Sequence, residues 1–203
     1  MGYPRALAPT FCVADMKANH LKLQPVRLST ANRLMRIAWS LCWAILYRPS
    51  PVPFHAWRRA LLRAFGARIA PKAKPYPSAR VWAPWNLEMG EHSCLAHGVD
   101  CYCVASVSLG PYATVSQYSY LCSASHDYRS SEFPMPLEAA PIRIGANAWV
   151  AADVFVGPGV SIGAGVVVGA RSTVLADIPE WTVVAGSPPR QIGTRPQFSR
   201  DAT

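Results

Sequence analysis

Residues 141–179 read PIRIGANAWVAADVFVGPGVSIGAGVVVGARSTVLADIP, and this stretch decides the fold. An aliphatic side chain returns at every sixth position, and the residue that follows it is small in every case but the last. A period of six fits neither an α-helix nor the simple alternation of one strand. It predicts short strands joined by corners, with small residues where the backbone turns tightly. The aliphatic positions are Ile144, Val150, Val156, Ile162, Val168 and Val174.

The same period occurs earlier in the chain. Three short strands and three corners close one triangular coil, and each aliphatic residue then points into the prism. Such coils stack about 4.8 Å apart, with backbone groups paired between neighbouring coils. We therefore predict an all-β fold, a parallel β-helix over residues 81–186. A β-sandwich with glycine-rich turns is the alternative, but it does not require six consecutive matches at one spacing. The earlier positions are Leu109, Val115 and Leu121 and, more weakly, Met89, Leu95 and Cys101.

The first 80 residues differ in charge from the rest. They carry 14 Lys and Arg against one acid, whereas residues 81–203 carry six against ten, so the two parts hold about +13 and −4. We interpret residues 1–80 as a basic arm and residues 187–203 as a tail. The arm's charge favours an anionic partner such as a membrane surface or a phosphorylated substrate, or it is only a solvated face. Nucleic acid would also suit the charge, but no nucleic-acid-binding motif is recognised, so we expect no nucleic-acid partner.

Two helices are predicted in the arm, over residues 28–47 and 56–65, while residues 1–25 carry no periodic signal. The run IAWSLCWAILY at residues 37–47 is too short to span a bilayer. Trp39, Trp43 and Tyr47 share one helical face, which suits either a membrane interface or packing on the protein itself.

The repeat is interrupted at residues 122–143. Three prolines there remove donors that a coil needs, so this segment is expected to project from the prism. It begins with Ser125, His126 and Asp127. A histidine can accept the proton of an attacking hydroxyl near neutral pH, so His126 is a candidate general base, or it only ties down the loop. Asp127 could orient the imidazole or be a solvated loop acid.

Together with the repeat, the runs SYLCSASHDY at 119–128 and VVAGSPPRQIGTR at 183–195 resemble the hexapeptide-repeat acetyltransferases. YRPSPVPFHAWRRALLRAFGARI at 47–69 resembles in particular the branch that acts in colanic acid and exopolysaccharide biosynthesis. The resemblance covers residues 28–195. It implies a left-handed β-helix, a homotrimer, and O-acetyl transfer from acetyl-CoA to a sugar hydroxyl.

The resemblance also implies roles for individual residues. His126 takes the place of the catalytic base, Trp149 lines the active site, and the backbone of Ala151 and Ala152 approaches the thioester. A backbone N–H there would stabilise the developing oxyanion. Further positions are expected to hold acetyl-CoA, with arginine suited to its phosphates: Gly169, Ala170, Arg171 and Arg190.

The chain departs from the family's pattern at three places. Leu175 and Ala176 stand where many relatives have Thr-Lys, so one phosphate contact is missing, and Arg171 is its expected replacement. Residues 187–189 read SPP where NPA is usual, and residues 95–97 read LAH where sugar acetyltransferases have an acceptor-binding Asn. The acceptor site therefore cannot be carried over.

Rival functions remain at this point. A zinc hydratase of the γ-carbonic anhydrase type would need three histidines, here His92, His97 and His126, to converge on one metal between subunits. A non-enzymatic scaffold that binds a membrane through its arm is another possibility. The six cysteines form no C-x-x-C pair and residues 1–20 hold no continuous apolar run, so we expect a reduced, cytoplasmic protein without metal, which can lie at the inner face of the membrane.

Overall fold

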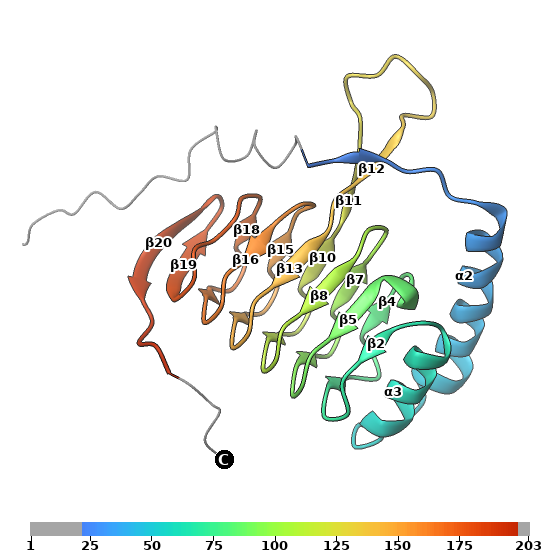
Figure 1. Cartoon of the computed structure of the whole chain (residues 1–203), viewed down its shortest axis with the longest axis horizontal. Coiled ribbons are helices and arrows are strands. Elements are labelled where there is room, and N and C mark those ends of the chain that lie inside the picture. The colour runs from blue at the N-terminus through green and yellow to red at the C-terminus, as the bar shows by residue number, and fades with distance from the viewer. Residues whose placement is uncertain (1–21, 199–203) are drawn as a thin grey trace, which may run out of the picture.

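The computed structural model describes residues 22–198, which form a triangular prism of stacked coils with two helices at its N-terminal end (Figure 1). Each turn of the chain visits three parallel sheets in the same order, so the sheets are the three faces of the prism. The first face contains β2 (Arg68–Ile69), β5 (Leu87–Met89), β8 (Val107–Leu109), β13 (Ile142–Ile144) and β16 (Ser161–Ile162).

The other two faces are built in the same way. The second face contains β3 (Lys74–Pro75), β6 (Cys94–Leu95), β9 (Thr114–Val115), β14 (Trp149–Val150), β17 (Val167–Val168), β19 (Thr182–Gly186) and β20 (Pro189–Thr194). The third face contains β4 (Arg80–Val81), β7 (Asp100–Tyr102), β10 (Tyr120–Cys122), β15 (Phe155–Val156) and β18 (Thr173–Val174). A short 3-10 helix, η2 (Pro84–Asn86), joins the first coil to the second.

The predicted inward positions form the core. The six aliphatic residues from Ile144 to Val174 are each at most 2% exposed, and so are the residues of the two earlier blocks. Equivalent residues lie in register on adjacent coils, as Ile144 does with Ile162. The six-residue period is thereby confirmed as the period of the coil.

The coils extend beyond the range expected from the sequence. The first coil begins at β2 and not at Val81, and its inward positions Ile69, Pro75 and Val81 keep the period of six. A proline at the middle position hides this coil from a search for aliphatic repeats. At the other end, β20 pairs antiparallel with β19, so part of the expected tail is a strand. Residues 1–21 and 199–203, parts of the predicted arm and tail, lie outside the described residues.

The two predicted helices are present, and they cover the first coil. α2 (Thr30–Cys42) continues through a π-helical turn, η1 (Trp43–Tyr47), and α3 (His55–Ala64) follows. Ser29 caps α2 by accepting a 3.1 Å hydrogen bond from the Asn32 N–H. Trp39 and Tyr47 are buried against the coil, so the aromatic face packs on the protein itself and is not the exposed face. Within the described part of the chain, none of the helices has the length and apolar content that a membrane span requires.

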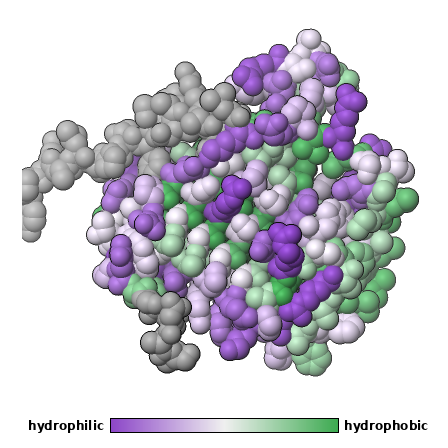
Figure 2. Space-filling view, viewed as in Figure 1, coloured by the Kyte–Doolittle hydropathy of each residue, from purple (hydrophilic) through white to green (hydrophobic). Residues whose placement is uncertain are grey.

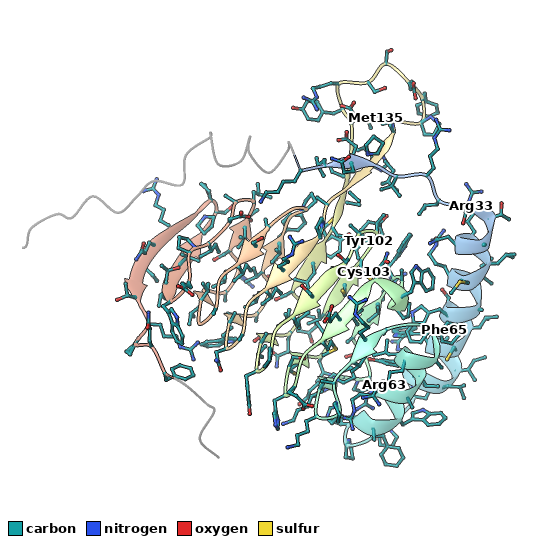
Figure 3. All side chains as sticks on the ribbon, in the orientation of Figure 1. Arg33, Arg63, Phe65, Tyr102, Cys103 and Met135 are labelled. Carbon is teal, nitrogen blue, oxygen red and sulfur yellow. The ribbon has the colours of Figure 1, made fainter. Side chains whose placement is uncertain are left out.

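Three arginines of the arm help the helices to cover the first coil. N–H groups of each coil donate to carbonyls of the next coil, as Ala70 does to Met89, so the carbonyls of the first coil point away from the stack. Side chains of the helices donate to them, among them that of Arg63 on α3, which is labelled in Figure 3. The pairs are Arg58 to Pro75, Arg59 to Ala73, Arg63 to Ile69, Trp39 to Val81 and Trp43 to Ala79, at 2.6–3.0 Å. Unpaired buried acceptors are costly, so these donors stabilise the open end of the prism.

The predicted projecting segment is a β-hairpin. β11 (Ala124–His126) pairs antiparallel with β12 (Leu137–Ala139), and β1 (Gln24–Pro25) adds to the other edge of β12. The hairpin stands out from the prism between the third and fourth coils (Figure 1).

Candidate active site

His126 ends β11 and is exposed to solvent on the hairpin. Its Nδ1 lies 3.0 Å from the carbonyl oxygen of Met135 on the opposite arm of the hairpin (Figure 3). A carbonyl only accepts hydrogen bonds, so this contact favours the tautomer with the proton on Nδ1. Nε2 is then the unprotonated nitrogen, which is the state that a general base requires.

Asp127 does not orient this imidazole. Its backbone N–H donates to Pro136, and its Oδ1 accepts from the backbone N–H of Arg129 at 3.0 Å and pairs with the Arg129 side chain at 3.4 Å. Asp127 is therefore part of the loop's own turn. The Met135 carbonyl takes the orienting role, and no sequence signal marks a backbone group of this kind.

A second group of predicted residues lies along the second face of the prism. Trp149 is 48% exposed on β14, and its indole N–H donates to the Ser116 hydroxyl one coil below at 2.9 Å. The Ala151 N–H donates to the Val168 carbonyl at 2.9 Å and belongs to the ladder between coils. It is therefore not free to stabilise an oxyanion. Among the described residues no acceptor is recorded for the Ala152 N–H, which leaves it as the candidate donor.

The next coil continues this line of residues. Arg171 has a positive φ of 58° at the corner after β17, and its Nε lies 3.3 Å from an Asp153 carboxylate oxygen. Its side chain is 85% exposed. Gly169, at the start of the same corner, has no room for a side chain, since a Cβ would lie 2.8 Å from that of Ala185. Ala170 lies between them, and Arg190 is exposed on β20 further up the same face.

One chain does not bring these two groups together. His126 projects from the corner between the third and first faces, because its hairpin follows β10 and precedes β13. Residues 151–153 and 169–171 form the corner between the second and third faces. The whole third face therefore separates the candidate base from the candidate acetyl-CoA residues, although both lie near the fourth coil.

Within one chain, the three histidines of the zinc alternative do not converge. His92 lies at the corner between the first and second faces and stacks on Tyr112, with ring centroids 4.8 Å apart. His97 lies at the next corner, with its Nδ1 2.9 Å from the Ser78 hydroxyl. The three histidines thus occupy three different corners. In the described residues no group of three His, Cys, Asp or Glu side chains is placed to hold a metal ion.

A triangular prism of stacked coils with a six-residue period defines a hexapeptide-repeat protein. The family described as "Bacterial transferase hexapeptide (six repeats)" matches residues 141–176. WcaF of Escherichia coli (strain K12), provisionally named a colanic acid biosynthesis acetyltransferase, is 41% identical over 150 residues, which cover 74% of this chain and 81% of WcaF. The chain therefore belongs to the hexapeptide-repeat acetyltransferase family that includes WcaF.

Solved structures agree with this assignment. A hexapeptide-repeat acetyltransferase from Vibrio cholerae O1 biovar eltor, complexed with acetyl-CoA, is 26% identical with a TM-score of 0.73, and the match covers 83% of this chain and 91% of that one. A maltose O-acetyltransferase from Clostridium difficile 630 shares the fold, with a TM-score of 0.76 at 22% identity and coverage of 90% and 98%. The protein is an acetyltransferase of this family.

Proposed function

We propose that the chain transfers an acetyl group from acetyl-CoA to a hydroxyl of a sugar or polysaccharide precursor during exopolysaccharide assembly. The observation that carries the proposal is the imidazole of His126, exposed on a projecting hairpin with Nδ1 held by a carbonyl. The sugar-type acceptor is supported by the name of the relative WcaF, which refers to colanic acid biosynthesis.

The proposed reaction needs no acetyl-enzyme. Acceptor and acetyl-CoA bind together, the acceptor oxygen attacks the thioester carbonyl, and His126 Nε2 takes the hydroxyl proton as the C–O bond forms. The C–S bond then breaks, the CoA thiolate leaves, and the imidazolium returns the proton to it. The Ala152 N–H is the proposed donor to the oxyanion.

We propose that the site is shared between two chains of a homotrimer. In a ring of three copies whose third faces turn toward the axis, the hairpin corner of one chain meets the second–third corner of the next. This arrangement brings His126 to Trp149 and Ala152 of a neighbouring copy. Gly169 and Ala170 would lie along the pantetheine, and Arg171 and Arg190 would meet the phosphates.

The basic arm is proposed to hold the enzyme at the inner face of the cytoplasmic membrane. Part of its charge is used to cover the first coil, but the described residues 22–80 contain no Asp or Glu to offset the remainder. Anionic lipid headgroups attract such a segment.

The test is CoA release, measured with a thiol reagent against a panel of sugars, nucleotide sugars and small alcohols. We expect release above the rate of hydrolysis only with sugar-type acceptors, with one acetyl ester formed per CoA. Failure to bind acetyl-CoA at all would support the non-enzymatic scaffold. Transfer to amines but to no hydroxyl would contradict O-acetylation.

A further inference from the structure

The outer face of the continuous helix formed by α2 and η1 is apolar and exposed. Four aliphatic side chains follow one another at intervals of three, four and four residues, and each is 59–67% exposed: Leu34, Ile37, Leu41 and Ile45. This spacing places them on one side of the helix, opposite the buried Trp39 and Tyr47. The helix therefore has two apolar faces, and only one of them packs on the prism.

The apolar surface continues toward α3. Leu46, Phe54 and Trp57 are also exposed, and the Trp57 indole N–H donates to the Leu46 carbonyl at 3.0 Å. Figure 2 shows apolar side chains gathered on the flank that α2 and α3 form, at the right of the view. A contiguous apolar surface of this kind marks an interaction site.

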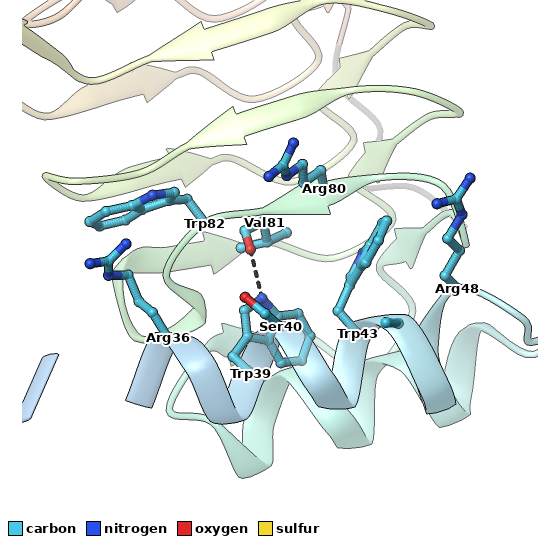
Figure 4. Close-up of a pocket in the computed structure, with 9 residues that line it drawn as sticks. Arg36, Trp39, Ser40, Trp43, Arg48, Arg80, Val81 and Trp82 are labelled. Atoms are coloured by element: carbon cyan, nitrogen blue, oxygen red, sulfur yellow. Dashed lines mark hydrogen bonds between the residues drawn. The ribbon is translucent and has the colours of Figure 1, made fainter. Parts of the chain in front are cut away.

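A groove borders this flank between α2 and β4 (Figure 4). It has a volume of about 460 Å³, and three arginines, Arg36, Arg48 and Arg80, line it together with Trp43 and Trp82. The Arg36 guanidinium lies 4.3 Å from the Trp82 ring centroid, and that of Arg48 lies 5.3 Å from Trp43. In the groove, two guanidinium groups therefore lie against the rings of tryptophan side chains.

The charges near the groove are almost all positive. Arg80 has Asp100 as its strand partner on the next coil, so its charge is partly offset. Arg36 donates to the neutral Asn32 side chain, and no ion pair is recorded for Arg36 or Arg48 within residues 22–198. Arg36 and Arg48 are also not among the arginines that donate to the first coil. Two guanidinium groups therefore remain for an external anion.

The groove and the apolar face form one surface. A shallower depression lined by Arg33, Arg36, Ile37, Ser40 and Leu41 lies between them. Going around the helix, aromatic residues face the prism, arginines come next, and aliphatic residues face outward. A helix with cations beside an apolar face, and too short to span a bilayer, suits a position in the plane of a membrane interface.

We propose that α2 docks on an anionic phospholipid surface, with Leu34, Ile37, Leu41 and Ile45 in the acyl boundary and lipid phosphate bound by Arg36 and Arg48. The inference gives the proposed membrane contact a location and a ligand chemistry, and it does not depend on acetyl transfer. An anionic lipid can contact the apolar face with its acyl chains and the arginines with its phosphate, because the phosphate lies at the head of the acyl chains. Arginine suits phosphate because its fork can donate two hydrogen bonds at once.

The experiment is co-sedimentation of the full chain with phosphatidylcholine vesicles, with and without one-third phosphatidylglycerol. We expect binding to the anionic vesicles only, weakened by salt. Arg36→Gln/Arg48→Gln should lower the affinity for anionic vesicles about tenfold or more, because each basic residue near an anionic membrane surface strengthens binding. The control Arg68→Gln/Arg143→Gln removes the same charge elsewhere and should change it by about twofold at most.

A second variant tests the apolar face. Ile37→Asp/Leu41→Asp should abolish vesicle binding and leave CoA release with a soluble acceptor unchanged, because neither residue touches the prism's interior. Equal binding of wild type to both vesicle types would overturn the proposal. The proposal would also be overturned if the double aspartate variant still bound vesicles, or if its oligomeric state, measured by light scattering, differed from that of wild type. Binding of inorganic phosphate in the groove by a protein that does not bind vesicles would overturn it as well. Vesicle binding does not require catalysis, so loss of acetyl transfer alone would count against the proposed function only.

Discussion

Replacing His126 by alanine should remove most of the turnover without harming the fold. The side chain is exposed at the end of a hairpin strand, so the substitution should change the free energy of unfolding by no more than about 0.5 kcal/mol. Within residues 22–198 the one hydrogen bond recorded for its side chain is to the Met135 carbonyl, which solvent can reach when the ring is gone. Asp127 cannot replace the base, because Arg129 and the loop turn engage its carboxylate.

The expected loss is about 10²- to 10⁴-fold in kcat, the usual contribution of a positioned base. This corresponds to about 3–5 kcal/mol of transition-state stabilisation. KM for acetyl-CoA should not change, because the proposed contacts to its pantetheine and phosphates come from Gly169, Ala170, Arg171 and Arg190 and not from His126. The assay is CoA release under saturating acetyl-CoA, with Asp127→Asn as the matched control that stays within about threefold of wild type. A His126→Ala enzyme with more than a tenth of wild-type kcat would refute the assignment.

Four further substitutions test the cofactor site and the prism. Arg190→Ala should raise KM for acetyl-CoA about tenfold or more and spare kcat, by loss of a charge-assisted phosphate contact; steady-state kinetics with an unchanged KM would remove this role. Gly145→Ala should cost about 2–3 kcal/mol in urea unfolding, because its Cβ would lie 2.5 Å from the Ala164 nitrogen on the next coil. Gly193→Ala, whose Cβ meets its nearest neighbour at 3.9 Å, should have no measurable cost, and equal stability of the two variants would contradict the stacking argument. Arg58→Met should cost about 3 kcal/mol in the same assay by leaving the Pro51 and Val52 carbonyls unpaired and the Pro75 carbonyl with His55 alone, and a fully stable variant would disprove the proposed cover of the first coil.

The period of the coil could be read from the sequence because it comes from a simple packing requirement. Each strand sends one side chain into the prism, and an aliphatic residue at every sixth position satisfies it. The first coil escaped detection because Pro75 occupies an inward position, where it is buried without being aliphatic. That Lys74–Pro75 is a strand is seen from its parallel pairing with Cys94–Leu95 on the second coil.

The candidate site could be predicted only in part. A histidine on a projecting loop is visible as a break in the repeat, but the carbonyl that fixes its tautomer is not. The Ala151 N–H was expected near the thioester, and the structure shows it donating to Val168, because the pleat alternates which backbone groups face the next coil. The positive charge of the arm suggested an external anion, whereas several of its arginines donate to the carbonyls of the first coil. That use depends on coil geometry, which composition does not contain.

A site divided between two chains can be tested directly by mixing two defective enzymes. One carries His126→Ala and the other carries Trp149→Ala/Arg190→Ala, and each should be nearly inactive when assayed alone at low acetyl-CoA. After joint unfolding and refolding at equal amounts, about a quarter of the interfaces in a random trimer pair an intact histidine corner with an intact acetyl-CoA corner. We therefore predict that CoA release returns to about a quarter of the wild-type rate. A mixture no more active than the average of its two parents would show that the site does not lie between neighbouring chains.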